Sequence, residues 1–140
     1  MSVGRVVEFC SYKLRPGSGA AFHSLVSERS VPLLRAAHMD VVAFGPSLHD
    51  PDSYYLVRSY ESMEHLQSSQ DAFYASAAWR QGPREAIVAL IENDADAVMW
   101  LTGEAIDALR RSAAAVDGDS GAVKSVDTGA EQVVKHAIEK

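Results

Sequence analysis

The sequence is short of several features that would point directly to a function. It has a single cysteine, Cys10, so no disulfide can form within the chain, and we expect a reducing, cytoplasmic location. The longest basic run is Arg110-Arg111, and the formal net charge is -6. Because nucleic acids and anionic membranes attract basic surfaces, we expect neither of them as a partner.

Long apolar runs and ligand-binding motifs are also missing. No stretch is long enough to span a bilayer, and the start, MSVGRVVEF, lacks the apolar segment of a signal peptide. The five histidines show no metal-binding spacing with one another or with acidic residues. Gly17 and Gly19 lack the spacing of a phosphate-binding loop. We therefore expect no metal and no cofactor.

What is present is the pattern of a small globular domain, with 47% apolar and 23% charged residues in 140. Residues 6–14 are rich in β-branched and aromatic side chains and predict a strand, which Pro16-Gly17 ends. Ser18 is a suitable N-cap for a helix with apolar residues at helical spacing. Pro32 should kink or end this helix near Val31.

The second half repeats the alternation of strands and helices. Residues 41–44 and 53–60 predict two adjacent strands, joined through the turn-forming segment GPSLHDPDS. A helix should begin at Ser62 and run in two pieces, with a break at Gly82-Pro83. The acidic segment ENDAD should end its second piece, and residues 97–101 should form the last strand.

The order β-α-β-β-α-β predicts an α+β, ferredoxin-like fold, with a four-stranded antiparallel sheet and both helices on one face. We expect residues 1–101 to form this domain. Residues 102–140 should be a C-terminal helical extension, which begins with a helix capped by Thr102. A Gly/Ser/Asp linker and a short amphipathic helix from Thr128 should follow.

Large apolar side chains occupy both faces of the predicted sheet. A ferredoxin-like monomer leaves one sheet face in water, where such side chains would form an adhesive patch. Burying each aromatic ring is worth roughly 1.5–3 kcal/mol. We therefore expect a homodimer, packed sheet to sheet about a two-fold axis. The side chains concerned are Phe9, Tyr12, Tyr54, Tyr55, Met99 and Trp100.

Three segments, VEFCSYKLRPGSGAAFHSL, GPSLHDPDSYYLVRSYESMEHL and FYASAAWRQGPREAIVALIE, resemble the NIPSNAP family of the dimeric α+β barrel superfamily, in matching order over residues 6–101. The resemblance implies a homodimer and a small-molecule-sized cavity between sheet and helices, but no settled reaction. The family often has an Arg-Thr-Tyr-like triplet in the first strand, where this chain has Cys10-Ser11-Tyr12. Related cofactor-free monooxygenases tend to carry a histidine on the second helix, and His65 lies a turn away from that place.

Arg58 and Glu8 are the candidate catalytic residues. A guanidinium beside phenols can hold a carboxylate or an enolate. Glu8, if desolvated on a sheet face, would have a raised pKa and could act as a general base. The structural alternatives, which we favour, are an Arg58 that stacks on a ring or pairs with Glu8, and a Glu8 that lies in water or pairs with an arginine.

Five further residues are candidate ligand contacts. Period-two alternation puts Tyr54 and Tyr60 on the same strand face as Arg58, and Tyr12 could meet them in the cavity. Trp79 and Arg84 flank the Gly82-Pro83 break, where they could line an entrance. The alternatives are packing for the tryptophan and a solvated charge for the arginine.

These features favour a protein that binds a small apolar metabolite. Cofactor-independent oxidation or isomerisation would need only a polarising side chain and a base in a dry pocket. The alternatives are a non-catalytic module that recruits a partner protein, and a ligand sensor without turnover. The sequence leaves open whether the protein is an enzyme.

Overall fold

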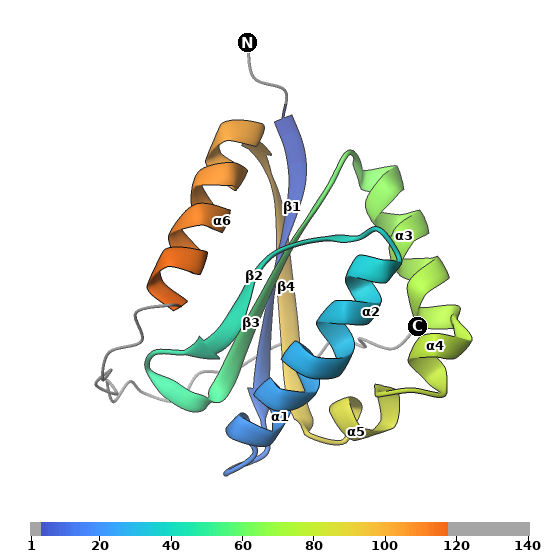
Figure 1. Cartoon of the computed structure of the whole chain (residues 1–140), viewed down its shortest axis with the longest axis vertical. Coiled ribbons are helices and arrows are strands. Elements are labelled where there is room, and N and C mark those ends of the chain that lie inside the picture. Colours follow the sequence, from blue (N-terminus) through green and yellow to red (C-terminus); the bar gives the residue numbers. More distant parts are fainter. Residues whose placement is uncertain (1–3, 118–140) are drawn as a thin grey trace.

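The computed structural model describes residues 4–117 of the chain, and its centre is a four-stranded antiparallel sheet (Figure 1). The strands lie in the order β2-β3-β1-β4. They are β1 (Gly4–Leu14), β2 (Asp40–Ser47), β3 (Asp50–Tyr60) and β4 (Ile91–Thr102). With helices between β1 and β2 and between β3 and β4, the chain has the predicted β-α-β-β-α-β order, and the ferredoxin-like α+β fold is confirmed.

The first helical segment runs without interruption from α1 (Gly19–Leu25) through the π-helical turn η1 (Val26–Ser30) to α2 (Val31–Ala36). Pro32 does not end the segment. The wide π turn lies just before it, where the proline ring would otherwise meet the preceding carbonyl groups. Of the two outcomes predicted near Val31, a kink or an end, the end does not occur, because the segment continues to Ala36. The helix is instead irregular there, with the π turn up to Ser30.

The Pro16-Gly17 turn is tied to the start of β3. The Asp52 carboxylate accepts hydrogen bonds from the backbone N–H groups of Gly17, at 2.8 Å, and Gly19, at 2.9 Å. Gly17 has φ 83°, in the left-handed region that favours glycine. A Cβ at Gly19 would lie 1.9 Å from the Pro51 carbonyl oxygen, so only glycine fits there. These contacts fix where the first helix leaves the sheet.

The second helical region has three pieces, namely α3 (Met63–Ala75), α4 (Ala77–Arg80) and α5 (Arg84–Val88). The predicted break at Gly82-Pro83 is present, but a second break occurs at Ser76, whose hydroxyl caps α4. The prediction that ENDAD ends the last helix is wrong. Helix α5 ends at Val88, and residues 92–96 belong to β4, in which residues 93–96 pair with β1.

The sheet carries helices on both faces (Figure 1). Helices α1 to α5 cover one face, where the larger core includes Phe22, Leu34 and Tyr60. Helix α6 (Gly103–Asp117) covers part of the opposite face and buries Ile106, which is 1% exposed, against Val7 and Val57. Thr102 accepts a hydrogen bond from the Ala105 N–H at 3.1 Å, which is the predicted helix cap.

Helix α6 therefore supplies part of the cover that the sequence analysis assigned to a second copy. Exposed apolar side chains remain on β4, an edge strand of this sheet. They lie on both of its faces, because Val98 and Trp100 pair with Glu8 and Val6 whereas Met99 pairs with Val7. These side chains are Val98, Met99 and Trp100, of which Trp100 is 60% exposed, and Tyr55 of β3 is exposed separately on the α6 face. The homodimer stays a prediction, as does the domain division at residue 101.

Two further expectations concern the C-terminal extension and membrane-spanning segments. The Gly/Ser/Asp linker and the helix expected from Thr128 lie outside the described residues. Between residues 4 and 117, no helix is long and apolar enough to cross a membrane.

Candidate functional site

A buried ion pair lies at the centre of the sheet face that α1 to α5 cover. Glu8 on β1 and Arg58 on β3 are direct cross-strand neighbours. Arg58 Nη2 lies 2.9 Å from Glu8 Oε1, and the two residues are 2% and 3% exposed. The structure thus brings the two candidate catalytic residues together, in the pairing given above as the structural alternative.

Side chains from β3 and α3 complete a polar cluster around this pair. The Gln70 amide donates to Glu8 Oε1 at 2.9 Å, and Tyr60 donates to the same oxygen at 3.5 Å. Arg58 Nη1 donates to the Tyr74 hydroxyl at 3.0 Å. We call these five residues, Glu8, Arg58, Tyr60, Gln70 and Tyr74, the Arg58 cluster.

Gln70 and Tyr74 were not among the residues predicted from the sequence, although the sequence carries a signal for both. Leu66, Gln70, Phe73 and Tyr74 recur at helical spacing along one face of α3, and all four are buried. A polar glutamine within an apolar helical stripe has to find a hydrogen-bond partner in the core. Its position therefore indicated a buried polar cluster opposite α3.

The cluster keeps Glu8 ionised. Burial by itself raises the pKa of Glu8. The charge of Arg58 and the hydrogen bond from Gln70 lower the pKa by more than burial raises it, so the net pKa is below the usual 4.5. The expected raised pKa of Glu8 is therefore wrong, because its partner outweighs desolvation. Burial raises the pKa of Cys10 to about 12 and raises the pKa values of Tyr60 and Tyr74. These three groups stay protonated at neutral pH.

A small cavity lies beside the Arg58 cluster, between the sheet and the helices. Tyr12, Tyr54 and Trp79 line it, and Tyr74 belongs to both the cavity wall and the cluster. Its volume of about 20 Å³ is room for about one water molecule. The space is therefore smaller than the ligand-sized cavity that the family resemblance implies. Arg84, on α5, is half-buried and does not line it.

Two buried hydrogen-bond donors near this cavity lack an acceptor. Neither Arg58 Nε nor Trp79 Nε1 has a hydrogen-bond partner within residues 4–117, and both residues are 2% exposed. Leaving a buried donor unsatisfied costs about 1–3 kcal/mol. Because both groups donate, the entity that satisfies them has to present an oxygen or another acceptor.

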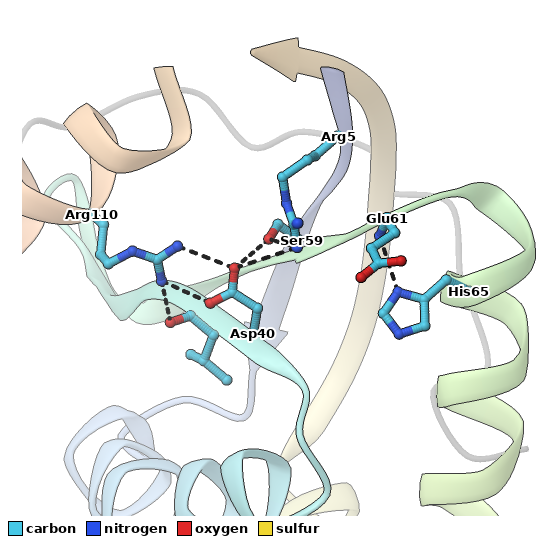
Figure 2. A network of polar contacts seen from close by, with 7 residues as sticks. Arg5, Asp40, Ser59, Glu61, His65 and Arg110 are labelled. Atoms are coloured by element: carbon cyan, nitrogen blue, oxygen red, sulfur yellow. Dashed lines mark hydrogen bonds and ion pairs between the residues drawn. The ribbon is translucent and has the colours of Figure 1, made fainter. Parts of the chain in front are cut away.

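One residue of the cavity wall, Tyr54, is hydrogen-bonded to a histidine on α1. The Tyr54 hydroxyl lies 2.6 Å from His23 Nδ1, and Tyr54 is 2% exposed while His23 is half-buried. His65 does not line the cavity. Its Nδ1 accepts a hydrogen bond from the Glu61 N–H at 3.0 Å instead (Figure 2). Within the described residues, no group of three histidine, cysteine or acidic side chains could hold a metal ion.

A second polar cluster ties α6 to the sheet (Figure 2). Arg110 on α6 makes a two-pronged contact with the Asp40 carboxylate on β2, at 2.8 and 3.1 Å. Ser59 donates to the same carboxylate, and Arg5 lies 3.9 Å from it. Burial raises the pKa of Asp40, but the hydrogen bonds from Arg110 and Ser59 lower it more, so Asp40 stays charged.

Neither a protein-family model nor a curated protein sequence matches this chain. Solved structures do match. A NIPSNAP family protein from Agrobacterium tumefaciens superposes with a TM-score of 0.64 at 17% identity, covering 70% of this chain and 88% of that one. A NIPSNAP-like domain protein from Burkholderia xenovorans gives 0.63 at 18% identity, covering 68% and 83%.

This chain has a NIPSNAP-like fold. That fold also resembles a putative antibiotic biosynthesis monooxygenase from Nitrosomonas europaea, with a TM-score of 0.52 at 13% identity, over 67% of this chain and 95% of that one. The resemblance drawn from the sequence is thus confirmed for the fold. At these sequence identities the shared fold does not specify a reaction.

Proposed function

We propose that this NIPSNAP-like protein binds a small, mostly apolar molecule with an oxygen acceptor, between the sheet and α1 to α5. The proposal is supported by two buried N–H donors, Arg58 Nε and Trp79 Nε1, which have no acceptor among the residues that the structure describes. A carbonyl or phenolate oxygen satisfies such donors, and the aromatic rings of the cavity wall suit an apolar body.

Ligand entry requires the cavity to widen, and α4 to α5 is the segment suited to this movement. Helix α4 has four residues and α5 has five, with the Gly82-Pro83 break between them. Such short helices hold few internal hydrogen bonds, and segments of this kind open at low free-energy cost. Trp79 belongs to α4, so an outward shift of this segment enlarges the space next to Tyr74.

The chemistry that the site favours is stabilisation of negative charge on a bound oxygen. Arg58 is a fixed cation in a dry environment, where it polarises a carbonyl or stabilises an enolate or phenolate. Cofactor-independent oxidation and isomerisation share this step. Glu8 serves as the counter-ion of Arg58 in this proposal rather than as a base. A ligand sensor would show the same binding without oxygen uptake or product.

Fluorescence titration with a naphthoquinone and a naphthol tests the binding proposal. In a Trp100→Phe background Trp79 is the only tryptophan, and we expect saturable quenching. Tyr74→Phe removes the hydroxyl that orients Arg58 and should weaken binding about threefold to tenfold. Tyr55→Phe, which removes an exposed hydroxyl on the other sheet face, is the matched control. Unsaturable quenching, or equal affinity in both variants, would contradict the proposal.

We also propose that a second copy covers the exposed apolar side chains of the edge strand β4, namely Val98, Met99 and Trp100. Exposed apolar side chains on both faces of one edge strand favour self-association. Trp100→Lys should convert a dimer to a monomer in sedimentation at micromolar concentration. Leu48→Lys places the same charge at an exposed apolar residue of the β2–β3 turn and should leave the dimer intact. A monomeric wild-type protein would refute this assembly.

A further inference from the structure

A groove on another part of the molecule is larger than the cavity beside Arg58. It has a volume of about 260 Å³ and lies between the end of α2, strand β2 and the C-terminal half of α6. Its floor is apolar, with Met39 and residues 41–43, all buried. Arg35 and Arg110 line it together with the small side chain of Ala114. It shares no lining residue with the cavity beside the Arg58 cluster.

The charge of this groove is positive. Among residues 4–117, Asp40 is the only acidic residue that lines the groove, and Arg110, Arg5 and Ser59 already surround its carboxylate. Arg35, at the exposed end of α2, pairs with no carboxylate within residues 4–117. The guanidinium of Arg110 has more N–H groups than its contacts with Asp40 and Val41 use. Two cationic side chains, Arg35 and Arg110, therefore lie beside an apolar floor, and both have N–H groups that can donate to a ligand.

We propose that this groove binds a small organic carboxylate. Its carboxylate group lies between Arg35 and Arg110, whose planar guanidinium groups match carboxylate geometry. Its apolar body lies on Met39 and residues 41–43. The volume, a little below the usual range for ligand sites, suits a molecule with a short aliphatic or single-ring body. This site goes beyond the function proposed for the Arg58 cluster and does not depend on it.

The position of the groove gives such a ligand a structural effect. Arg35 belongs to the end of α2, whereas Arg110 belongs to α6, so the carboxylate bridges two elements that pack on different faces of the sheet. A ligand that binds only when α6 is seated on the sheet stabilises that arrangement by mass action. Occupancy of the groove therefore controls how firmly α6 covers its face.

Titration of the full chain with hexanoate, followed by amide chemical shifts, tests the proposal. We expect saturable shifts at residues 41–43, 113 and 114, and none around Tyr54 and Trp79. Arg35→Gln removes an exposed charge without disturbing the core and should weaken hexanoate binding at least about tenfold. Arg111→Gln removes the same charge from the neighbouring exposed position of α6 and should leave the affinity unchanged.

Two further measurements test whether binding requires the carboxylate charge of the ligand and whether it occurs in this groove. Hexanamide, which is uncharged and of matching size, should bind much more weakly than hexanoate. Ala114→Phe fills the groove at an exposed residue without changing its charge, and should abolish the shifts. The proposal is overturned if hexanamide binds as tightly as hexanoate, or if Arg35→Gln behaves like Arg111→Gln. It is also overturned if the full chain binds no hexanoate, whether water or another segment of the chain fills the groove.

Discussion

Arg58→Ala is expected to lower the free energy of unfolding by about 3–5 kcal/mol, because it leaves the carboxylate of Glu8 buried without its partner. The loss exceeds that of the ion pair itself. Tyr74 also loses its hydrogen-bond partner, while Gln70 and Tyr60 alone cannot compensate the Glu8 charge. The arginine is thus a structural requirement of the core as well as the proposed ligand contact.

The same substitution should reverse the pH dependence that Glu8 gives to stability. In the wild type its folded-state pKa lies below 4.5, so its contribution is present above that pH and is lost as the pH falls through the folded-state value. Without Arg58, burial dominates and the folded-state pKa rises above 4.5. The variant therefore loses stability as the pH rises, and the difference from wild type is largest at neutral pH.

Urea unfolding at a series of pH values measures both effects. Arg80→Ala, which removes an exposed arginine of α4, should change stability by less than about 0.5 kcal/mol. The double variant Glu8→Gln with Arg58→Met removes both charges and should recover part of the loss. Equal losses for Arg58→Ala and Arg80→Ala, or a loss that does not vary with pH, would show that the pair does not have this energetic role.

The order of elements followed from local patterns, but their ends did not. Alternating apolar residues in 53–60 identified β3, yet the strand begins at Asp50, because the pairing of Asp50 with Ser47 of β2 outweighs the turn preference of Asp50 and Pro51. Similarly, the acidic residues 92–96 indicated the end of a helix and are in fact part of β4. Cross-strand pairing is a tertiary effect that local propensity does not contain.

Local patterns likewise predicted one part of the candidate site, and tertiary effects determine the other part. Period-two alternation put Arg58 on one face with Tyr54 and Tyr60, and the register of β1 against β3 brought Glu8 to it. The pKa direction of Glu8 could not follow from the sequence, because it depends on whether desolvation or the partner charge is larger. The groove beside Arg35 could not be foreseen either, since it requires α6 to lie against β2.

Ile106→Asp is expected to release α6 from the sheet. Ile106 is the residue of α6 most deeply buried against Val7 and Val57, and truncating such a side chain alone costs about 2–5 kcal/mol. A carboxylate at this position would lie on an apolar surface without a partner, which adds to that cost. Because α6 can move into water, the helix should detach, and Arg110 should leave Asp40 and the groove with it.

Hydrogen exchange and hexanoate titration of Ile106→Asp together establish how far α6 belongs to the fold. We expect the amides of α6 to lose protection and hexanoate binding to disappear, whereas Ala108→Asp, at an exposed position of the same helix, should preserve both. If β1 to β4 keep their protection, residues 1–101 form a domain that folds without the extension, as the sequence predicts. If the sheet loses protection with the helix, burial of Val7 and Val57 by α6 is part of the core, and the division at residue 101 is wrong.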